Sequence, residues 1–338
     1  MRTTVFVVAL AAIVSVPGPA SAQAWLPGAG QGAVAMLFQD MAVRQHSYSD
    51  GQRIDVGDID SHNVMLDLTY GVTDKVAIGL SLPFVSARYK GGSAHPGSLL
   101  DDGSFHGTFQ DFRLSARYGL VTGGTAVTPF ADLIVPSHEY DYYGHAAPGR
   151  KLTELQLGLS VGHVLTRGLP GTFVQARYSY GFTQQSLGRY HDRSNLDAEI
   201  GYFINPRLRV SGLAASQYTH GGLPFTHEFP GDLCGVSNRD VTPALLLACP
   251  TFTHHDRLAR ANLVDVGLGA QFSITRRLDV YGSYTTTVFG ESVHALHHGI
   301  SIGVSWGLGK SGPTAPSLDE QAKQTLPKCL CEKGVKAP

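Results

Sequence analysis

The chain has 338 residues, a formal net charge of −1 and only 16% charged side chains. This balance provides no basic surface, so it argues against a nucleic-acid partner. Forty glycines, 15 phenylalanines and 14 tyrosines are typical of short strands joined by turns, and not of packed layers of helices.

The first 24 residues have the pattern of a secretory signal peptide. Arg2 precedes an apolar run from Val5 to Val16, and small residues with A-x-A spacing follow at 20–24. An uncleaved anchor helix is the alternative, but Pro17 and Pro19 end the run too early for a membrane span. We therefore assign 1–24 to a signal peptide and place the mature chain beyond the inner membrane.

Five segments then repeat one pattern, in which two runs of about ten residues flank a short turn, the length that a tilted membrane strand needs. The turns fall at 73–75, 122–124, 166–171, 205–207 and 275–277. A first strand near 32–46 and a last strand at 298–309 bring the count to about twelve. The six connections between hairpins are longer, as expected when one rim of a barrel faces the periplasm and the other faces outside.

Side chains alternate along these strands. In 195–202 the apolar residues fall on one face and the polar residues on the other, and 264–274 repeats the pattern. A soluble sandwich would turn the apolar face inward, whereas an outer-membrane barrel would turn it toward lipid. Periodicity alone leaves both readings open.

Aromatic residues distinguish the two readings. They gather toward both ends of the expected strands, where membrane barrels carry girdles: Tyr70, Tyr118, Tyr202, Phe272 and Trp306 toward the short turns, and Phe84, Tyr180, Phe182, Tyr218 and Phe289 toward the long loops. In lipid the first strand must also pair with the last. The sequence predicts an all-β, antiparallel, up-and-down barrel at 25–309 in the outer membrane, followed by a flexible periplasmic tail at 310–338.

Four segments, "YGVTDKVAIGLSLPFV", "GTFQDFRLSARYGL", "VPSHEYDYYGHAAPGR" and "RSNLDAEIGYFINPRL", carry a family resemblance. They resemble hairpins of the outer-membrane transporter family named for the MetA pathway of phenol degradation, which is related in outline to FadL-like and Tsx-like channels. The resemblance covers about 32–309. It implies an outer-membrane channel or transporter, and the family name hints at aromatic or hydrophobic substrates.

Alternation also predicts which charged residues face the lumen, because Arg or Lys facing lipid at the midplane costs about 2–4 kcal/mol. Eight acids and four bases fall on the inward face: Asp67, Asp111, Arg113, Arg117, Asp132, Glu154, Arg177, Asp197, Glu199, Arg209, Asp265 and Asp279. Two interpretations remain open: a mildly cation-preferring constriction, or a ladder of ion pairs that stiffens a narrow barrel.

Fourteen of the fifteen histidines fall in or beside the long connections. Neutral imidazole binds transition metals well, and the adjacent pairs His254, His255 and His297, His298 are candidate ligands. The alternative is that polar residues simply accumulate in loops.

The four cysteines form two pairs. Cys234 and Cys249 share the longest outer loop in an oxidising compartment, so we expect a disulfide that contributes about 3 kcal/mol. Cys329 and Cys331 form a C-x-C in the tail. This spacing is a weak candidate for a soft-metal site, and the alternative is an oxidised or incidental pair.

No H-E-x-x-H motif supports an enzyme. His106 with Asp111, or His220 with Ser216, would be the candidates for a hydrolase at the outer rim. The sequence instead predicts a passive channel for a small solute, with no cofactor, and with outer-membrane lipid and the barrel-assembly machinery as partners. A rim enzyme and a plugged surface barrel with metal-capturing loops are the alternatives, and any periplasmic partner of the tail is unknown.

Overall fold

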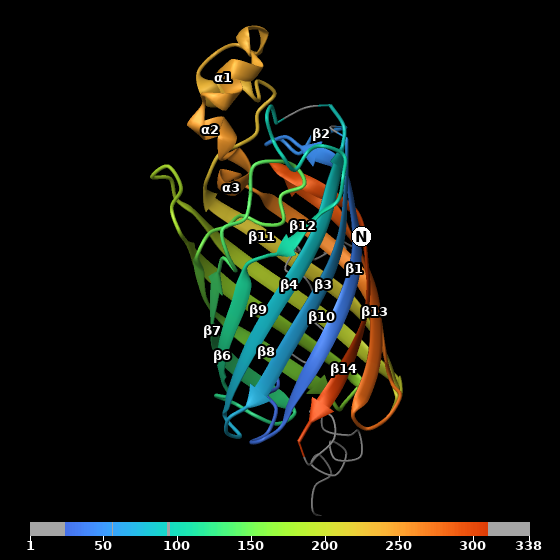
Figure 1. Ribbon diagram of the computed structural model, residues 1–338. Coiled ribbons are helices and arrows are strands. Elements are labelled where there is room, and N and C mark those ends of the chain that lie inside the picture. The colour runs from blue at the N-terminus through green and yellow to red at the C-terminus, as the bar shows by residue number, and fades with distance from the viewer. Residues whose placement is uncertain (1–23, 56, 93–94, 310–338) are drawn as a thin grey trace, which may run out of the picture.

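The computed structural model describes residues 24–55, 57–92 and 95–309, and within them the chain forms a closed antiparallel barrel (Figure 1). The predicted signal peptide, apart from Ala24, and the predicted tail with Cys329 and Cys331 lie outside the described residues. Twelve long strands build the wall: β1 (Gly32–Ser47), β3 (Asp58–Gly71), β4 (Val76–Lys90), β6 (Phe112–Tyr118), β7 (Thr125–Val135), β8 (Glu154–Leu165), β9 (Thr172–Thr183), β10 (His191–Asn205), β11 (Leu208–Gly221), β12 (Asn262–Ser273), β13 (Leu278–Glu291) and β14 (Val293–Leu308).

The barrel closes between its first and last strands. β1 pairs with β14 from Gly32↔Leu308 to Ser47↔Val293, and its other edge pairs with β3. Every other long strand pairs with its sequence neighbour, so the predicted up-and-down order is confirmed. Closure satisfies the backbone groups that an open edge would expose to lipid.

Two short strands are additions to the predicted twelve. β2 (Arg53–Ile54) pairs with the outer end of β1, and β5 (His106–Phe109) pairs with the outer end of β4. Both lie in long connections, so they thicken the long-loop rim without changing the wall.

The connections confirm short turns at one rim and long loops at the other, with one exception. Only Ser292 separates β13 from β14, so the prediction of a long connection there is wrong. His297, which we expected in that loop, lies on β14 together with His298, where we expected the last strand to begin. The strand extends outward because its outer half pairs with β1, which supplies the hydrogen bonds that a loop would lack.

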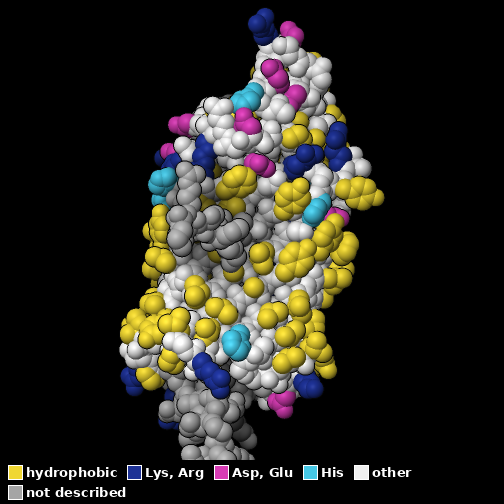
Figure 2. Space-filling model, turned by 180° about the vertical axis from the view of Figure 1, so that it is seen from behind, with side chains coloured by type: hydrophobic (Ala, Val, Ile, Leu, Met, Phe, Trp, Pro, Cys, Tyr) yellow, Lys and Arg dark blue, Asp and Glu magenta, His cyan; other side chains and the backbone are white. Residues whose placement is uncertain are grey.

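The wall is apolar outside and polar inside. Exposed hydrophobic residues follow the outward positions of every long strand, while Gln39, Asp132 and Glu199 are buried on the inward face. Figure 2 shows hydrophobic side chains over the wall, with charged side chains gathered toward the two ends. The soluble-sandwich reading is therefore wrong, because its apolar faces would be buried.

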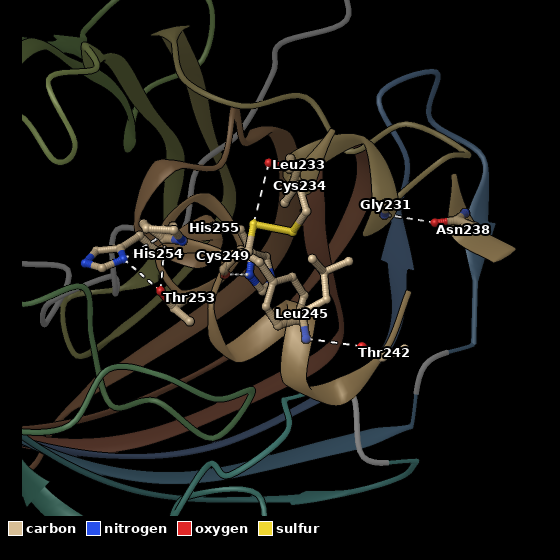
Figure 3. The surroundings of a disulfide bond; sticks show 12 residues. Gly231, Leu233, Cys234, Asn238, Thr242, Leu245, Cys249, Thr253, His254 and His255 are labelled. Carbon is tan, nitrogen blue, oxygen red and sulfur yellow. Dashed lines mark hydrogen bonds between the residues drawn. A yellow bond between two sulfur atoms is a disulfide. The ribbon is translucent and has the colours of Figure 1, made fainter. Parts of the chain in front are cut away.

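A small cap stands on the long-loop rim (Figure 1). The connection at 222–261 folds into five short helices: η1 (Gly231–Cys234), η2 (Asn238–Asp240), α1 (Pro243–Leu247), α2 (Pro250–Thr253) and α3 (His255–Leu258). The structure contains the predicted disulfide between Cys234 and Cys249, whose Cα atoms are 5.8 Å apart. Figure 3 shows this bond, with His254 and His255 following closely after Cys249. Among the described residues, no helix is long and apolar enough to cross a membrane.

The cap has an apolar core of its own. Leu246, Cys249 and Phe252 form a buried cluster, against which Tyr143 from the β7–β8 connection packs. A second buried cluster joins the outer ends of β3 and β4 to Leu100 and Ala146 from two other connections. The long loops thus pack on one another as a small globular layer above the barrel.

Candidate functional site

A cavity of about 500 Å³ lies inside the barrel. All twelve long strands contribute residues to its lining, from Gln39 on β1 to Gly299 on β14. Gly149, Arg150 and Leu152 of the β7–β8 connection also reach it from the long-loop side. The cavity is therefore the lumen of the barrel and not a pocket between loops.

One charged group lies on the lumen wall around Asp132 on β7. Its carboxylate accepts hydrogen bonds from Arg177 on β9 and from Ser115 at 2.7 Å, and Arg113 Nε lies 4.0 Å from it. The guanidinium of Arg177 also lies 3.6 Å over the ring of Phe130. Because Asp132 is fully buried, these contacts compensate the loss of its hydration.

A second charged group lies nearer the long-loop rim around Glu154. Arg150 donates to this carboxylate at 2.9 Å and Arg193 donates to the same oxygen. Gln156 donates to the other oxygen at 2.7 Å. One buried acid thus holds two arginines that approach from a loop and from β10.

The structure places ten of the twelve predicted lumen residues along the cavity. The two others lie elsewhere: Arg209 borders a small separate cavity and donates to Gln271 at 2.7 Å, and Asp279 is opposite Ser273 on the β12–β13 ladder. The ten that line the lumen are Asp67, Asp111, Arg113, Arg117, Asp132, Glu154, Arg177, Asp197, Glu199 and Asp265.

The lumen also contains two arginines that the sequence reasoning missed. Arg193 has the same inward parity as Asn195, and it was missed because the strand was expected to begin at Asn195 and not at His191. Arg150 reaches the lumen from a loop, for which no periodic signal exists. The cavity therefore has seven acids and five arginines, a formal difference of 7 − 5 = 2 negative charges, and not the eight against four expected.

The chain that precedes β1 lies inside the short-turn end. Thr128 Oγ1 donates to the Ala24 carbonyl at 2.6 Å, and Trp25 Nε1 donates to the Gly123 carbonyl at 2.7 Å. A side chain at Gly162 would meet the Trp25 ring at 2.5 Å, so glycine is required for this close approach. This segment narrows the exit from the lumen.

Histidines gather at the base of the cap. We call His46, His95, His145, His255 and His294, with Asp101 and Asp256, the histidine cluster. His95 Nδ1 lies 2.9 Å from Asp101 and 3.1 Å from His145 Nδ1, and its Nε2 lies 3.3 Å from Asp256.

Burial and neighbouring charges shift the pKa values of His95 and Asp101 in the histidine cluster. Burial lowers the pKa of His95, but its contacts with Asp101 and Asp256 outweigh burial and raise that pKa to about 9. Burial raises the pKa of Asp101, but hydrogen bonds from His145, His95 and two backbone amides hold it below its usual range. An ionised Asp101 therefore faces two imidazole rings.

The predicted metal ligands are dispersed among different contacts. Only His255 joins the histidine cluster, while His254 bonds Tyr142 and the Pro250 carbonyl. His297 and His298 face each other on β14 with their Nδ1 atoms 2.9 Å apart. No local spacing could have paired His95 with His145, because they lie 50 residues apart in two different connections.

The pairs considered for a rim hydrolase do not form. His106 contacts Asp102 at 2.9 Å, whereas Asp111 accepts from Tyr140. His220 bonds Ser194 at 2.8 Å and not Ser216.

No family model matches the sequence, and no curated protein matches it. Among solved structures, the COG4313 outer membrane channel from Pseudomonas putida F1 superimposes with a TM-score of 0.64 at 12% identity, covering 86% of this chain and 99% of that chain. The chain has the fold of an outer-membrane channel. The NanC and KdgM porins superimpose on this barrel more loosely, with TM-scores of 0.44 and 0.43 at 9% identity, each covering 81% of this chain and 98% of theirs.

Proposed function

We propose that the protein is a passive outer-membrane channel for a small polar solute. The observation that carries the proposal is the closed barrel whose lumen is lined by all twelve strands and by charged side chains. A barrel that served only as an anchor would need no such cavity. The apolar outer face supplies the surface that a bilayer requires.

The charged groups favour a polar solute. Its hydroxyl, carboxyl or amino groups can exchange water for the arginines and acids around Asp132 and Glu154. An aromatic or hydrophobic solute, which the family resemblance implies, would have to pass these charges without replacing their hydration. Solute would enter beside the cap, cross the two charged groups and leave past Trp25.

Most charges around the two groups are paired, so selectivity should be mild. Asp132 and Glu154 each bond at least one arginine, which leaves little uncompensated potential. Two further lumen charges are Asp111, which accepts a hydrogen bond from Tyr140, and Arg117, which donates to Thr69 Oγ1 at 3.5 Å. Substitutions there change the lumen field without breaking either charged group.

Single-channel recording in a planar bilayer tests the proposal, with a salt gradient to report ion selectivity. We expect stepwise conductance. Asp111→Asn should shift the reversal potential away from the Nernst potential of the cation, because it removes a negative charge from the lumen. Arg117→Gln removes a positive charge and should shift the reversal potential toward the Nernst potential of the cation. Glu139→Gln is the matched control, since that side chain is 91% exposed and does not line the cavity.

A protein that inserts into the bilayer and stays silent would contradict a passive channel and favour a plugged surface barrel. Equal selectivity in all four proteins would contradict the lumen assignment. Insertion is checked independently by the heat-dependent gel mobility that folded barrels show.

A further inference from the structure

Three potential metal-ligand atoms meet at the base of the cap. His95 Nδ1, His145 Nδ1 and Asp101 Oδ2 are separated by 2.9, 3.1 and 3.3 Å. Their side chains are at most 5% exposed. The three residues come from two connections, so the contact joins loops that are distant in sequence.

Hydrogen bonds alone do not satisfy this arrangement. If both Nδ1 atoms carry protons, both can donate to Asp101, but the two N–H groups then face each other at 3.1 Å. If only one carries a proton, the lone pair of the other faces the ionised Asp101 oxygen. No placement of imidazole protons therefore makes all three contacts favourable.

A cation between the three atoms removes the conflict. With metal–ligand bonds of about 2.0–2.2 Å, the observed separations correspond to angles of about 80–110° at the metal, which a distorted tetrahedral site can accommodate. Two imidazole nitrogens and one carboxylate oxygen form a donor set typical of zinc. The geometry points to a divalent transition-metal site, zinc by its donors, held by His95, His145 and Asp101.

Neighbouring groups hold the three ligands in place. Asp101 Oδ2 also accepts from the His145 amide, and Oδ1 accepts from the Ala146 amide, each at 3.1 Å. His95 Nε2 lies 3.3 Å from Asp256, the outer carboxylate that orients many metal-bound histidines. The His145 ring stacks on Tyr89 at 4.2 Å between ring centres.

A second triad, His95 with His255 and Asp256, is close in space but less suitable. The His95 and His255 rings are stacked 5.1 Å apart with only 10° between their planes. Lone pairs that lie in nearly parallel planes do not converge on one ion. The His95 and His145 rings are inclined by 74°, which allows their lone pairs to converge.

The metal would act as a structural bond within the cap. It would tie the β4–β6 connection to the β7–β8 connection, and through Asp256 to the helical segment at 222–261. Because the ligands are buried, binding would accompany folding and release would be slow. This role is separate from conduction, so it stands or falls independently of the proposed channel.

Metal content of the full-length protein tests the site. The protein is refolded in detergent with Zn²⁺ or Co²⁺, passed over a chelating resin and measured by inductively coupled plasma mass spectrometry. We expect about one equivalent of retained metal, and for Co²⁺ the intense visible absorption of a four-coordinate site. Absence of retained metal in the wild-type protein would overturn the proposal without any variant.

Variants locate the metal. His145→Gln should lower retained metal at least tenfold, whereas His255→Gln should leave it unchanged. Asp256→Asn should weaken the affinity about 10–100-fold, as loss of an outer carboxylate does. His297→Gln with His298→Gln is the matched control for a histidine pair outside the cluster. Retention in folded His145→Gln protein, or loss in His255→Gln protein, would overturn the assignment.

Discussion

The barrel and its cap have opposite interiors. On the barrel wall Leu268 is 71% exposed while Asp132 and Glu154 are buried, whereas in the cap Phe252 and Leu258 are buried. The reason is the medium outside each region. Lipid accepts apolar side chains and rejects charges, so the barrel places its charges inside, whereas water around the cap drives apolar side chains together.

The two regions are consequently stabilised in different ways. The barrel relies on a closed hydrogen-bonded ladder and on ion pairs that neutralise its buried charges. The cap relies on apolar packing and on the disulfide between Cys234 and Cys249. Substitutions that remove one kind of contact should therefore affect one region and spare the other.

The largest effect is expected at the charged group around Glu154, near the long-loop rim of the barrel. Glu154→Gln leaves Arg150 and Arg193 without their carboxylate in a buried site, which should lower the free energy of unfolding by about 3–5 kcal/mol. Reversible guanidinium titration of the barrel in lipid vesicles, followed by tryptophan fluorescence, measures this change.

Glu139→Gln is the control for the same chemical change at an exposed ion pair with Lys151. It should leave the unfolding transition where it is, because solvent already screens that pair. Equal destabilisation by the two variants would show that the buried charged group contributes no more than a surface pair.

The next largest effect is the stability cost of placing a charge on the outer surface, which should be high where lipid surrounds the barrel and low where water surrounds the cap. Leu268 on β12 and Leu247 on α1 are both exposed, by 71% and 52%. Leu268→Arg should cost up to about 4 kcal/mol because it exposes a charge to lipid. Leu247→Arg should change stability by less than about 0.5 kcal/mol because water surrounds it. The same titration in vesicles compares the pair, and similar costs would contradict the membrane placement.

The smallest expected effect is confined to the cap. Cys234→Ser with Cys249→Ser reopens a loop of 15 residues and should lower local cap stability by about 3 kcal/mol, while the barrel transition stays within error. Hydrogen exchange of residues 222–261 against the barrel strands measures both. A shift of the barrel transition of similar size would mean that the two regions unfold together.

Much of the barrel could be predicted because strand alternation is a local signal. Leu196 and Asp197 face opposite sides of the wall whatever else the chain does, and the turn at 73–75 sets the register of its hairpin. The disulfide was also predictable, since both cysteines lie in one loop of an oxidising compartment. Arg193 was predictable in principle from the same alternation.

Other features depended on contacts between distant segments. His297 was expected in a loop, but pairing of β14 with β1 extends the strand through it as far as Val293. Arg150 enters the lumen only because the β7–β8 connection folds inward. His95 and His145 meet because two loops pack under the helices of the cap.

The sequence by itself therefore determined the strands, the side of the wall that each strand residue faces and the closed barrel that lipid requires. Alternation and backbone pairing are repeated at each strand, so their signals are present in short stretches of chain. Only the tertiary structure decided which charges pair inside the lumen, how the long loops form a cap with its own core and which histidines meet. Those outcomes depend on the packing of loops that have no periodic pattern and whose partners lie far away along the chain.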